Sequence, residues 1–360
     1  MKKLAVVLGV FIVVGILVWI YSPDQKENVE NKPVVKIGVV MPLTGEWGYI
    51  GVSNQGAIDV ALKDLGNQST KYNYEVIFED SQFNAYKTAN IISKLINVDK
   101  VDAVISGFSL MGNIISPITE KNRVIHINSF GSDANIARGK YNFMNWTMPE
   151  AEVYKLIEVI NDKGYKNVVT ISLNDSGTLA QAKVIDEKLK VFGVTHSIRL
   201  INPGARDMRL EIQKAEASGV ELYILQLYNP ENSIFIRQLR ELGSKADVTA
   251  IETFSIYEDK SIVEGAWYID ASASNNDVTK RILEHNASVN TYGITNSYDN
   301  VMLLVKSFES ALSKDEAVEE LAKIKEYNGV TGALLQDDEG IFHSEAIVKV
   351  VKNGEILIEE

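Results

Sequence analysis

The sequence contains no cysteine among its 360 residues. This absence excludes disulfide bonds, thiolate metal sites, a cysteine nucleophile and lipid attachment to an N-terminal cysteine. Only four histidines are present, and none stands at the i, i+4 spacing that would place two imidazoles on one helix face: His126, His196, His285 and His343. We therefore expect neither a metal site nor a cofactor.

The chain also has few basic residues relative to acidic ones. Lys and Arg number 36 against 48 Asp and Glu, which gives a formal net charge of −12 and makes nucleic acid an unsuitable partner. Hydrophobic residues make up 46% and charged residues 23%, values that are ordinary for globular proteins. A length of 360 residues predicts two domains at roughly 100–200 residues each.

One long apolar run stands at the amino terminus. Lys2 and Lys3 precede Leu4 to Tyr21, a stretch without charge that ends in aromatic residues. It is longer than the roughly 7–15 residues of a cleavable signal core and close to the ~20 that span a bilayer. We expect residues 1–21 to be an uncleaved membrane anchor and 22–33 a polar linker, with the rest of the chain extracytoplasmic. The alternative is cleavage by a less selective peptidase, which would release a secreted or periplasmic protein.

From Val34 onward, short β-branched runs alternate with amphipathic stretches of helical length, a pattern typical of parallel βαβ units. The predicted strands are Lys36–Met41, Glu75–Glu79, Ala103–Ser106, Val124–Asn128, Val168–Leu173, Glu221–Leu227 and Val248–Glu252. The predicted helices are Gly51–Leu65, Ala85–Val98, Gly112–Lys121, Glu150–Lys163, Leu179–Phe192, Asp207–Ser218, Ser233–Leu242, Asp277–Val289, Asn296–Leu312 and Lys314–Lys325. The class is α/β. Near the end, Asn353-Gly354 predicts a hairpin between strands Ile341–Val351 and Glu355–Ile358.

In open parallel sheets, ligands bind at the carboxyl ends of the strands, so the loops there are the candidate site. The loop 42–51 carries Trp47 and Tyr49 between regularly spaced glycines. Ser109 follows the third strand and could receive a carboxylate, or could simply cap the next helix. Phe130 and Ser132 follow the fourth strand in a loop that could expose carbonyl groups, or that is an ordinary polar turn.

Three loops in the second half of the chain complete this set. They contain Ser176, Tyr228 and Glu252, each of which follows a predicted strand. A carboxylate at a strand end could accept an ammonium group while the opposite lobe holds a carboxylate. The pattern thus indicates a small zwitterion that contacts both halves of the protein.

Several motifs carry a family resemblance over nearly all of the chain beyond Val34. They are Lys36–Gly45, Gly51, Gln55-Gly56-Ala57, Gly107–Ser132, Glu264-Gly265, Ser297-Tyr298-Asp299, Tyr327–Gly332, Asp338-Glu339-Gly340 and Val348–Gly354. In their order and spacing, they resemble type I periplasmic binding proteins of the branched-chain amino-acid class, the receptors of ABC importers. The resemblance implies two Rossmann-like lobes with parallel-sheet cores and three crossings between them. Lobe one is expected to span 34–147 and 277–330, and lobe two 148–276 and 331–360.

The resemblance also implies roles for the candidate residues. Ser109 matches a hydroxyl on the ligand's α-carboxylate, Phe130 and Ser132 match a backbone carbonyl and a hydroxyl, and Glu252 falls near the ammonium-binding acid. The sequence departs from the family at Ser176 and Ile50, where aromatic residues are usual. Trp47, Tyr49 and Tyr228 are expected to compensate.

The implied function is capture of a small amino acid, branched-chain by default, through hinge closure and delivery to a membrane-bound ABC permease. The alternative is a sensor of the same fold that binds amides, urea or another small solute and signals to a partner. We expect no catalysis. The spacing Gly45-x-x-Gly48-x-x-Gly51 does not match the dinucleotide fingerprint, Ser106–Ser109 lacks a nucleophile elbow, and His126 is expected to be a strand residue.

Overall fold

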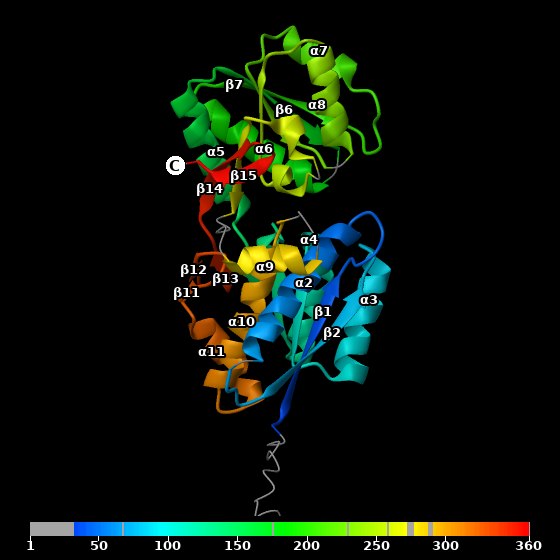
Figure 1. Ribbon diagram of the computed structural model, residues 1–360, viewed down its shortest axis with the longest axis vertical. Helices are drawn as coiled ribbons and strands as arrows, with labels where there is room; N and C mark the ends of the chain where they lie inside the picture. The colour runs from blue at the N-terminus through cyan, green and yellow to red at the C-terminus, as the bar shows by residue number, and fades with distance from the viewer. Residues whose placement is uncertain are drawn as a thin grey trace, which may run out of the picture.

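A computed structural model of the chain describes residues 32–66, 68–174, 176–228, 230–257, 259–271, 277–286 and 291–359. The predicted anchor and most of the linker lie outside these ranges. No helix within them is long and apolar enough to cross a membrane. The described chain forms two α/β lobes that lie one above the other (Figure 1).

The first lobe is built on an eight-stranded sheet with the order β11-β12-β13-β5-β4-β3-β1-β2. Its parallel part consists of β1 (Val34–Met41), β2 (Asn73–Asp80), β3 (Ala103–Gly107), β4 (Ile125–Ser129), β5 (Asn142–Asn145) and β13 (Ile341–His343). Two antiparallel strands extend one edge, β11 (Glu326–Asn328) and β12 (Ala333–Gln336). The central strands form nearly continuous apolar runs because both faces of the sheet are covered.

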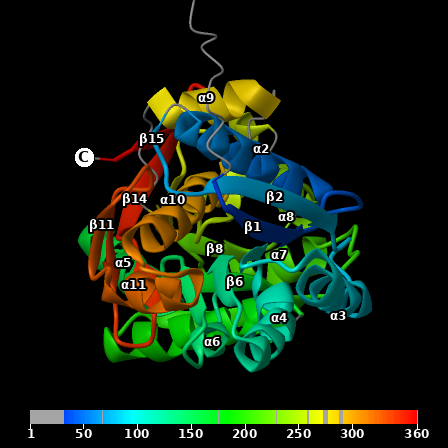
Figure 2. The same cartoon turned by 90° about the horizontal axis from the view of Figure 1, so that it is seen from below.

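Helices cover the two faces of this sheet (Figure 2). The core clusters that alternate side chains of β1 join show which helices lie on which face. Ile37 and Val39 share one core cluster with α2 (Gly48–Leu65) and α10 (Ile294–Ser310). Val40 shares another with α3 and α4 on the opposite face. Other α-helices of this lobe are α3 (Ala85–Lys94), continued by a π-helical turn at Leu95–Asp99, α4 (Ser109–Asn122), α9 (Asp277–Asn286) and α11 (Ala317–Lys323).

The second lobe contains a four-stranded parallel sheet of order β7-β6-β8-β9 and a three-stranded antiparallel sheet of order β10-β14-β15. The strands are β6 (Asn167–Leu173), β7 (Thr195–Ile201), β8 (Leu222–Gln226), β9 (Asp247–Ala250), β10 (Trp267–Ala271), β14 (Ala346–Lys352) and β15 (Glu355–Ile358). A parallel bridge between Ile251 and Ile269 joins the two sheets. The helices are α5 (Pro149–Lys163), α6 (Ser176–Val191), α7 (Arg209–Glu216) and α8 (Glu231–Glu241).

The last crossing between the lobes differs from the prediction. We expected lobe two to resume at residue 331, but β12 and β13 pair within the first sheet, with Ile341 of β13 beside Met144 of β5. The chain crosses only at Ser344 and Glu345, so the predicted strand Ile341–Val351 is divided there. That boundary was wrong because a strand pattern in sequence does not reveal that its two halves pair with different sheets.

The predicted hairpin at Asn353-Gly354 is confirmed. Lys352 pairs with Glu355 across the turn, and both turn residues have positive φ, 56° and 71°. These angles are those of a type I′ turn, which Asn-Gly favours. Five strands were not predicted, namely β5, β7, β10, β11 and β12; each is very short or mixes polar with apolar residues.

Asp299 of α10 holds the segment that leads toward the last crossing. Its Oδ1 accepts from the Val330 backbone N–H and its Oδ2 from that of Thr331, both at 2.8 Å. The side chain is fully buried, and burial raises its pKa to about 6 against the opposing effect of these donors. Two motifs of the family resemblance, Ser297–Asp299 and Tyr327–Gly332, therefore contact each other in the fold.

We predict that Asp299→Asn destabilises the protein by about 1–3 kcal/mol, because an amide leaves one buried backbone N–H facing another donor. Urea denaturation of the variant should show a lower midpoint than that of wild type. Asp338→Asn is the matched control, since Asp338 is exposed and its ion pair with Lys325 lies at the surface. Equal midpoints for Asp299→Asn and wild type would contradict this role.

Candidate binding site between the lobes

Aromatic side chains from strand ends of both lobes form a continuous cluster. Trp47 lies directly before α2, its ring centroid 5.3 Å from that of Tyr228, which follows β8 of the second lobe. On the other side Trp47 packs against Phe83 at 5.3 Å and Phe108 at 5.8 Å. Since parallel strands bring their carboxyl ends to one edge, the residues that follow them meet where the lobes face each other.

Phe130 continues this cluster inside the first lobe. Its ring lies 4.9 Å from Phe108, 5.4 Å from Tyr292 and 6.1 Å from Trp146. Two glycines leave room for it: a Cβ at Gly107 would lie 2.3 Å from the Phe130 ring, and one at Gly293 would lie 2.1 Å from it. The side chain of Phe130 is thus part of the aromatic cluster. The family resemblance, in contrast, assigns a role to its backbone carbonyl.

Glu252 connects the two lobes by hydrogen bonds. It follows β9, and its positive φ of 61° turns the chain sharply. Its Oε1 accepts from Trp146 Nε1 at 2.7 Å and its Oε2 from the Tyr292 hydroxyl at 3.2 Å, both donors belonging to the first lobe. The residue as a whole is half-buried, although its carboxylate has lost much of its hydration.

The pKa of Glu252 is raised from 4.5 to about 7. Loss of hydration is the main cause, and the nearby carboxylate Asp270 adds to it. Hydrogen bonds from Glu152, Trp146 and Tyr292 act in the opposite direction. A buried carboxylate among aromatic rings is costly to ionise, because it has lost its hydration. A bound cation would replace that hydration and stabilise the ionised form.

The structure places the predicted site residues as follows. Trp47, Phe130, Tyr228 and Glu252 meet in one region through the contacts above. Ser109 is the first residue of α4, and its Oγ accepts from the backbone N–H of the exposed Ser132 at 2.9 Å. Tyr49 lies in the first turn of α2, and Ser176 begins α6.

Trp146 and Tyr292 were missed by the sequence analysis, although both hydrogen-bond to Glu252. Trp146 follows β5, a strand of four residues in which two asparagines hide the apolar pattern. Tyr292 precedes α10, on which the predicted helix began two residues late. The rule that ligands bind at strand ends would have found Trp146 if β5 had been recognised.

His126 lies in β4, as predicted, and forms a polar ladder with its neighbours. Ser106 Oγ is 2.8 Å from His126 Nε2, and His126 Nδ1 is 3.2 Å from Asn142 Oδ1. The order serine, histidine, asparagine resembles that of a nucleophile and its base, but all three side chains are fully buried. Burial also lowers the pKa of His126 to about 4. The ladder therefore ties β3, β4 and β5 together with a neutral imidazole.

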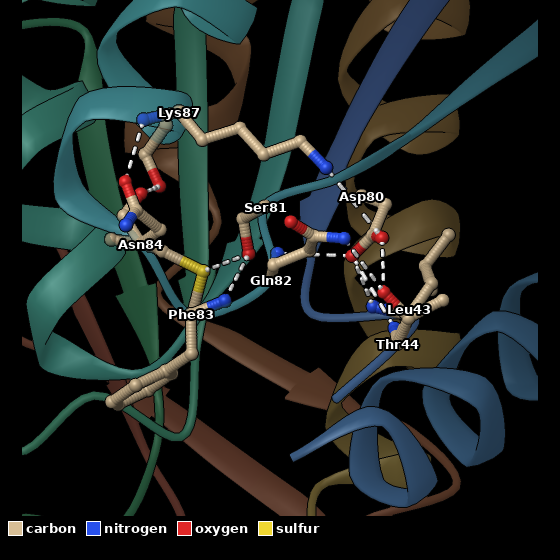
Figure 3. A network of polar contacts seen from close by, with 10 residues as sticks. Leu43, Thr44, Asp80, Ser81, Gln82, Phe83, Asn84 and Lys87 are labelled. Atoms are coloured by element: carbon tan, nitrogen blue, oxygen red, sulfur yellow. Dashed lines mark hydrogen bonds and ion pairs between the residues drawn. The ribbon is translucent and has the colours of Figure 1, made fainter. Parts of the chain in front are cut away.

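Asp80, at the end of β2, holds the loop that carries Trp47 (Figure 3). Its Oδ1 accepts from the backbone N–H groups of Leu43 at 2.8 Å and Thr44 at 3.3 Å, and its Oδ2 accepts from the Thr44 hydroxyl at 2.6 Å. Gln82 donates a further backbone N–H at 2.9 Å. Partial burial alone would raise the pKa of Asp80, but these donors hold it below its ordinary value.

Comparisons with known proteins agree with the fold. The sequence profile of a family described as "Periplasmic binding protein" matches residues 34–355. A search of curated proteins finds no match.

Solved structures give close matches in shape. The leucine-binding protein LivK of Thermotoga maritima is 23% identical with a TM-score of 0.78, over 91% of this chain and 98% of that one. LivJ of Streptococcus pneumoniae, solved with isoleucine, is 19% identical with a TM-score of 0.79, over 90% and 97%. A solute-binding protein of Rhodopseudomonas palustris, solved with 3,4-dihydroxybenzoic acid, is 16% identical with a TM-score of 0.77, over 90% and 95%. At these identities, the likeness is one of fold.

We predict that Asp80→Ala loosens the loop before α2, because the N–H groups of Leu43 and Thr44 lose their acceptor. Hydrogen exchange measured by mass spectrometry should speed up on the order of tenfold in peptides covering residues 42–51. Glu79→Gln, on the same strand, removes only an ion pair with Lys94 and should leave those peptides unchanged. Identical exchange in wild type and Asp80→Ala would refute the assignment.

Proposed function

This chain belongs to the periplasmic binding protein family, and we propose that it is the extracytoplasmic receptor of an ABC importer for a small amino-acid-like solute. The solute is held between the lobes and passed to a permease in the membrane. The protein binds without chemical conversion. Leucine and isoleucine are the first candidates, because related structures are described as binding leucine or contain isoleucine.

The observation that carries the proposal is the position of Glu252. It belongs to the second lobe, both of its carboxylate oxygens accept from donors of the first lobe, and aromatic rings surround those donors. A carboxylate in such surroundings suits an ammonium group, which gains a charged hydrogen bond and ring contacts together. Ser109 follows Phe108 directly in sequence and is hydrogen-bonded to Ser132, and the ligand's carboxylate is proposed to lie at these two serines.

Contacts between the lobes support capture by hinge closure. The Trp47–Tyr228 ring contact and the Trp146–Glu252 hydrogen bond both join one lobe to the other. Both pairs come from loops at strand ends, so a hinge motion separates or joins them without disturbing either sheet. A ligand that contacts both loops would favour the closed arrangement.

Acidity at the junction argues against two other ligand classes. An aromatic carboxylate, such as that bound by the Rhodopseudomonas protein, would place a second anion beside Glu252 and repel it. Urea and amides, the ligands of the alternative sensor role, carry no charge and would leave Glu252 uncompensated. We therefore place the ammonium-bearing solutes first.

We predict that L-leucine, L-isoleucine or L-valine raises the melting temperature of the protein, since a ligand of the folded state shifts unfolding. Urea, acetamide and 3,4-dihydroxybenzoate should not. A screen in which only the neutral or anionic compounds act would contradict the proposal.

Glu252→Gln should weaken binding of the amino acid on the order of 10–100-fold, because it replaces a charged hydrogen bond by a neutral one. Isothermal titration calorimetry measures the loss. Glu241→Gln, on the surface of α8, is the control and should bind like wild type. Equal affinity for Glu252→Gln and wild type would remove Glu252 from the site.

We further propose that residues 1–21 hold the protein at the outer face of the cell membrane. The basic Lys2 and Lys3 and the uncharged stretch Leu4–Tyr21 support this placement. The full chain should sediment with membranes and resist alkaline carbonate, whereas a version that starts at residue 32 should not. Recovery of the protein in the soluble fraction, shortened at its amino terminus, would count for cleavage instead.

A further inference from the structure

Glu152 is a second acid at the junction that the proposed function does not use. It lies in the first turn of α5, and only 1% of its surface is exposed. Its carboxyl group lies within hydrogen-bonding reach of that of Glu252, while its Oε1 has no hydrogen-bond partner among the described residues. A buried carboxyl group in this position calls for an explanation, because ionised acids are almost never buried without compensation.

A hydrogen bond between two carboxyl groups requires a proton on one of them. Glu252 already accepts from Trp146 and Tyr292, and both bonds favour its ionised form. Within the described part of the chain, no donor of this kind meets Glu152 Oε1, so a charge on Glu152 would lack the compensation that Glu252 has. The proton therefore resides on Glu152, which donates to Glu252.

Other charged groups around the pair reinforce this assignment. Asp270 of β10 lies close enough to disfavour ionisation of both glutamates. Lys349 of β14 neutralises Asp270 at 3.0 Å, and both are buried, so this lysine is already engaged. Burial and the negative charge of Glu252 hold the pKa of Glu152 well above its ordinary value. Tyr292 and Tyr268 stay protonated because burial raises their pKa values too.

We propose that Glu152 is an uncharged positioning residue that orients Glu252 through a donated hydrogen bond and limits the site to one negative charge, matched to a ligand with a single ammonium group. This inference rests on the proposed function. Glu252 then supplies a charged acceptor. Glu152 supplies a neutral one at Oε1, an oxygen to which no described group donates. A primary ammonium group has three N–H donors and can use both.

A pH dependence follows from the same arrangement. Glu252 must ionise to bind the cation, and its pKa in the absence of ligand is about 7. Affinity for an ammonium-bearing ligand should then be constant above that pKa. It should fall on the order of tenfold for each pH unit below it, because each binding event must release the Glu252 proton.

The first test needs no ligand. At about pH 8, ordinary carboxyl groups and most of Glu252 are ionised, so a neutral carboxylic acid can be seen by its C=O stretching band in the infrared spectrum of the full chain. We expect this band in wild type and in Glu150→Gln, an exposed neighbour on α5, and its loss in Glu152→Gln. Absence of the band from wild type, or its persistence in Glu152→Gln, would overturn the inference.

The second test uses L-leucine and calorimetry over a range of pH. Glu152→Gln keeps a neutral donor beside Glu252, so its affinity should stay within about threefold of wild type, with the same pH midpoint. Glu152→Ala removes the donor and should lose about tenfold with a higher midpoint. A midpoint lowered by about one unit in Glu152→Gln would mean that Glu152 is ionised in wild type, which contradicts the inference. If wild type binds no L-leucine, the proposed function is in question, and the infrared band alone decides the state of Glu152.

Discussion

The carboxylate of Glu252 is the group on which the arrangement of the two lobes depends. It projects from the second lobe, yet its hydrogen-bond donors Trp146 and Tyr292 belong to the first. Those donors are themselves packed against Phe130, which fits only because glycines stand at positions 107 and 293. The hydrogen bonds of one acid thus join the second lobe to the aromatic cluster of the first lobe.

Much of this could be read from the sequence because it follows from local patterns. Apolar runs in β1, β3 and β4 and amphipathic stretches such as α5 are long enough to identify, and Asn353-Gly354 specifies its turn by itself. Glu252 and Tyr228 were selected as candidates by their position after a strand, a choice that stays a prediction. The rest depends on contacts between distant segments. Glu152 was assigned simply to a helix, because nothing local indicates that its carboxyl group meets Glu252.

The last crossing illustrates the same limit. The residues of β13 and β14 are separated in sequence only by Ser344 and Glu345, but Ile341 pairs with Met144 in one sheet and Val348 with Ile269 in the other. Strand propensity is alike on both sides of Ser344, and only the available partner edge decides which sheet a segment joins. The boundary between lobes is therefore a property of the assembled sheets.

Thr147, in the first crossing, and Ser344, in the third, are linked by their hydroxyl groups at 2.5 Å, and Thr147 Oγ1 also lies 3.3 Å from the Ser344 carbonyl oxygen. Both side chains are buried. Two chain segments that are hydrogen-bonded to each other resist sliding and twisting past each other more than they resist bending. In the proposed hinge motion, this link would bring the same pair of loops back into the same register each time the lobes close.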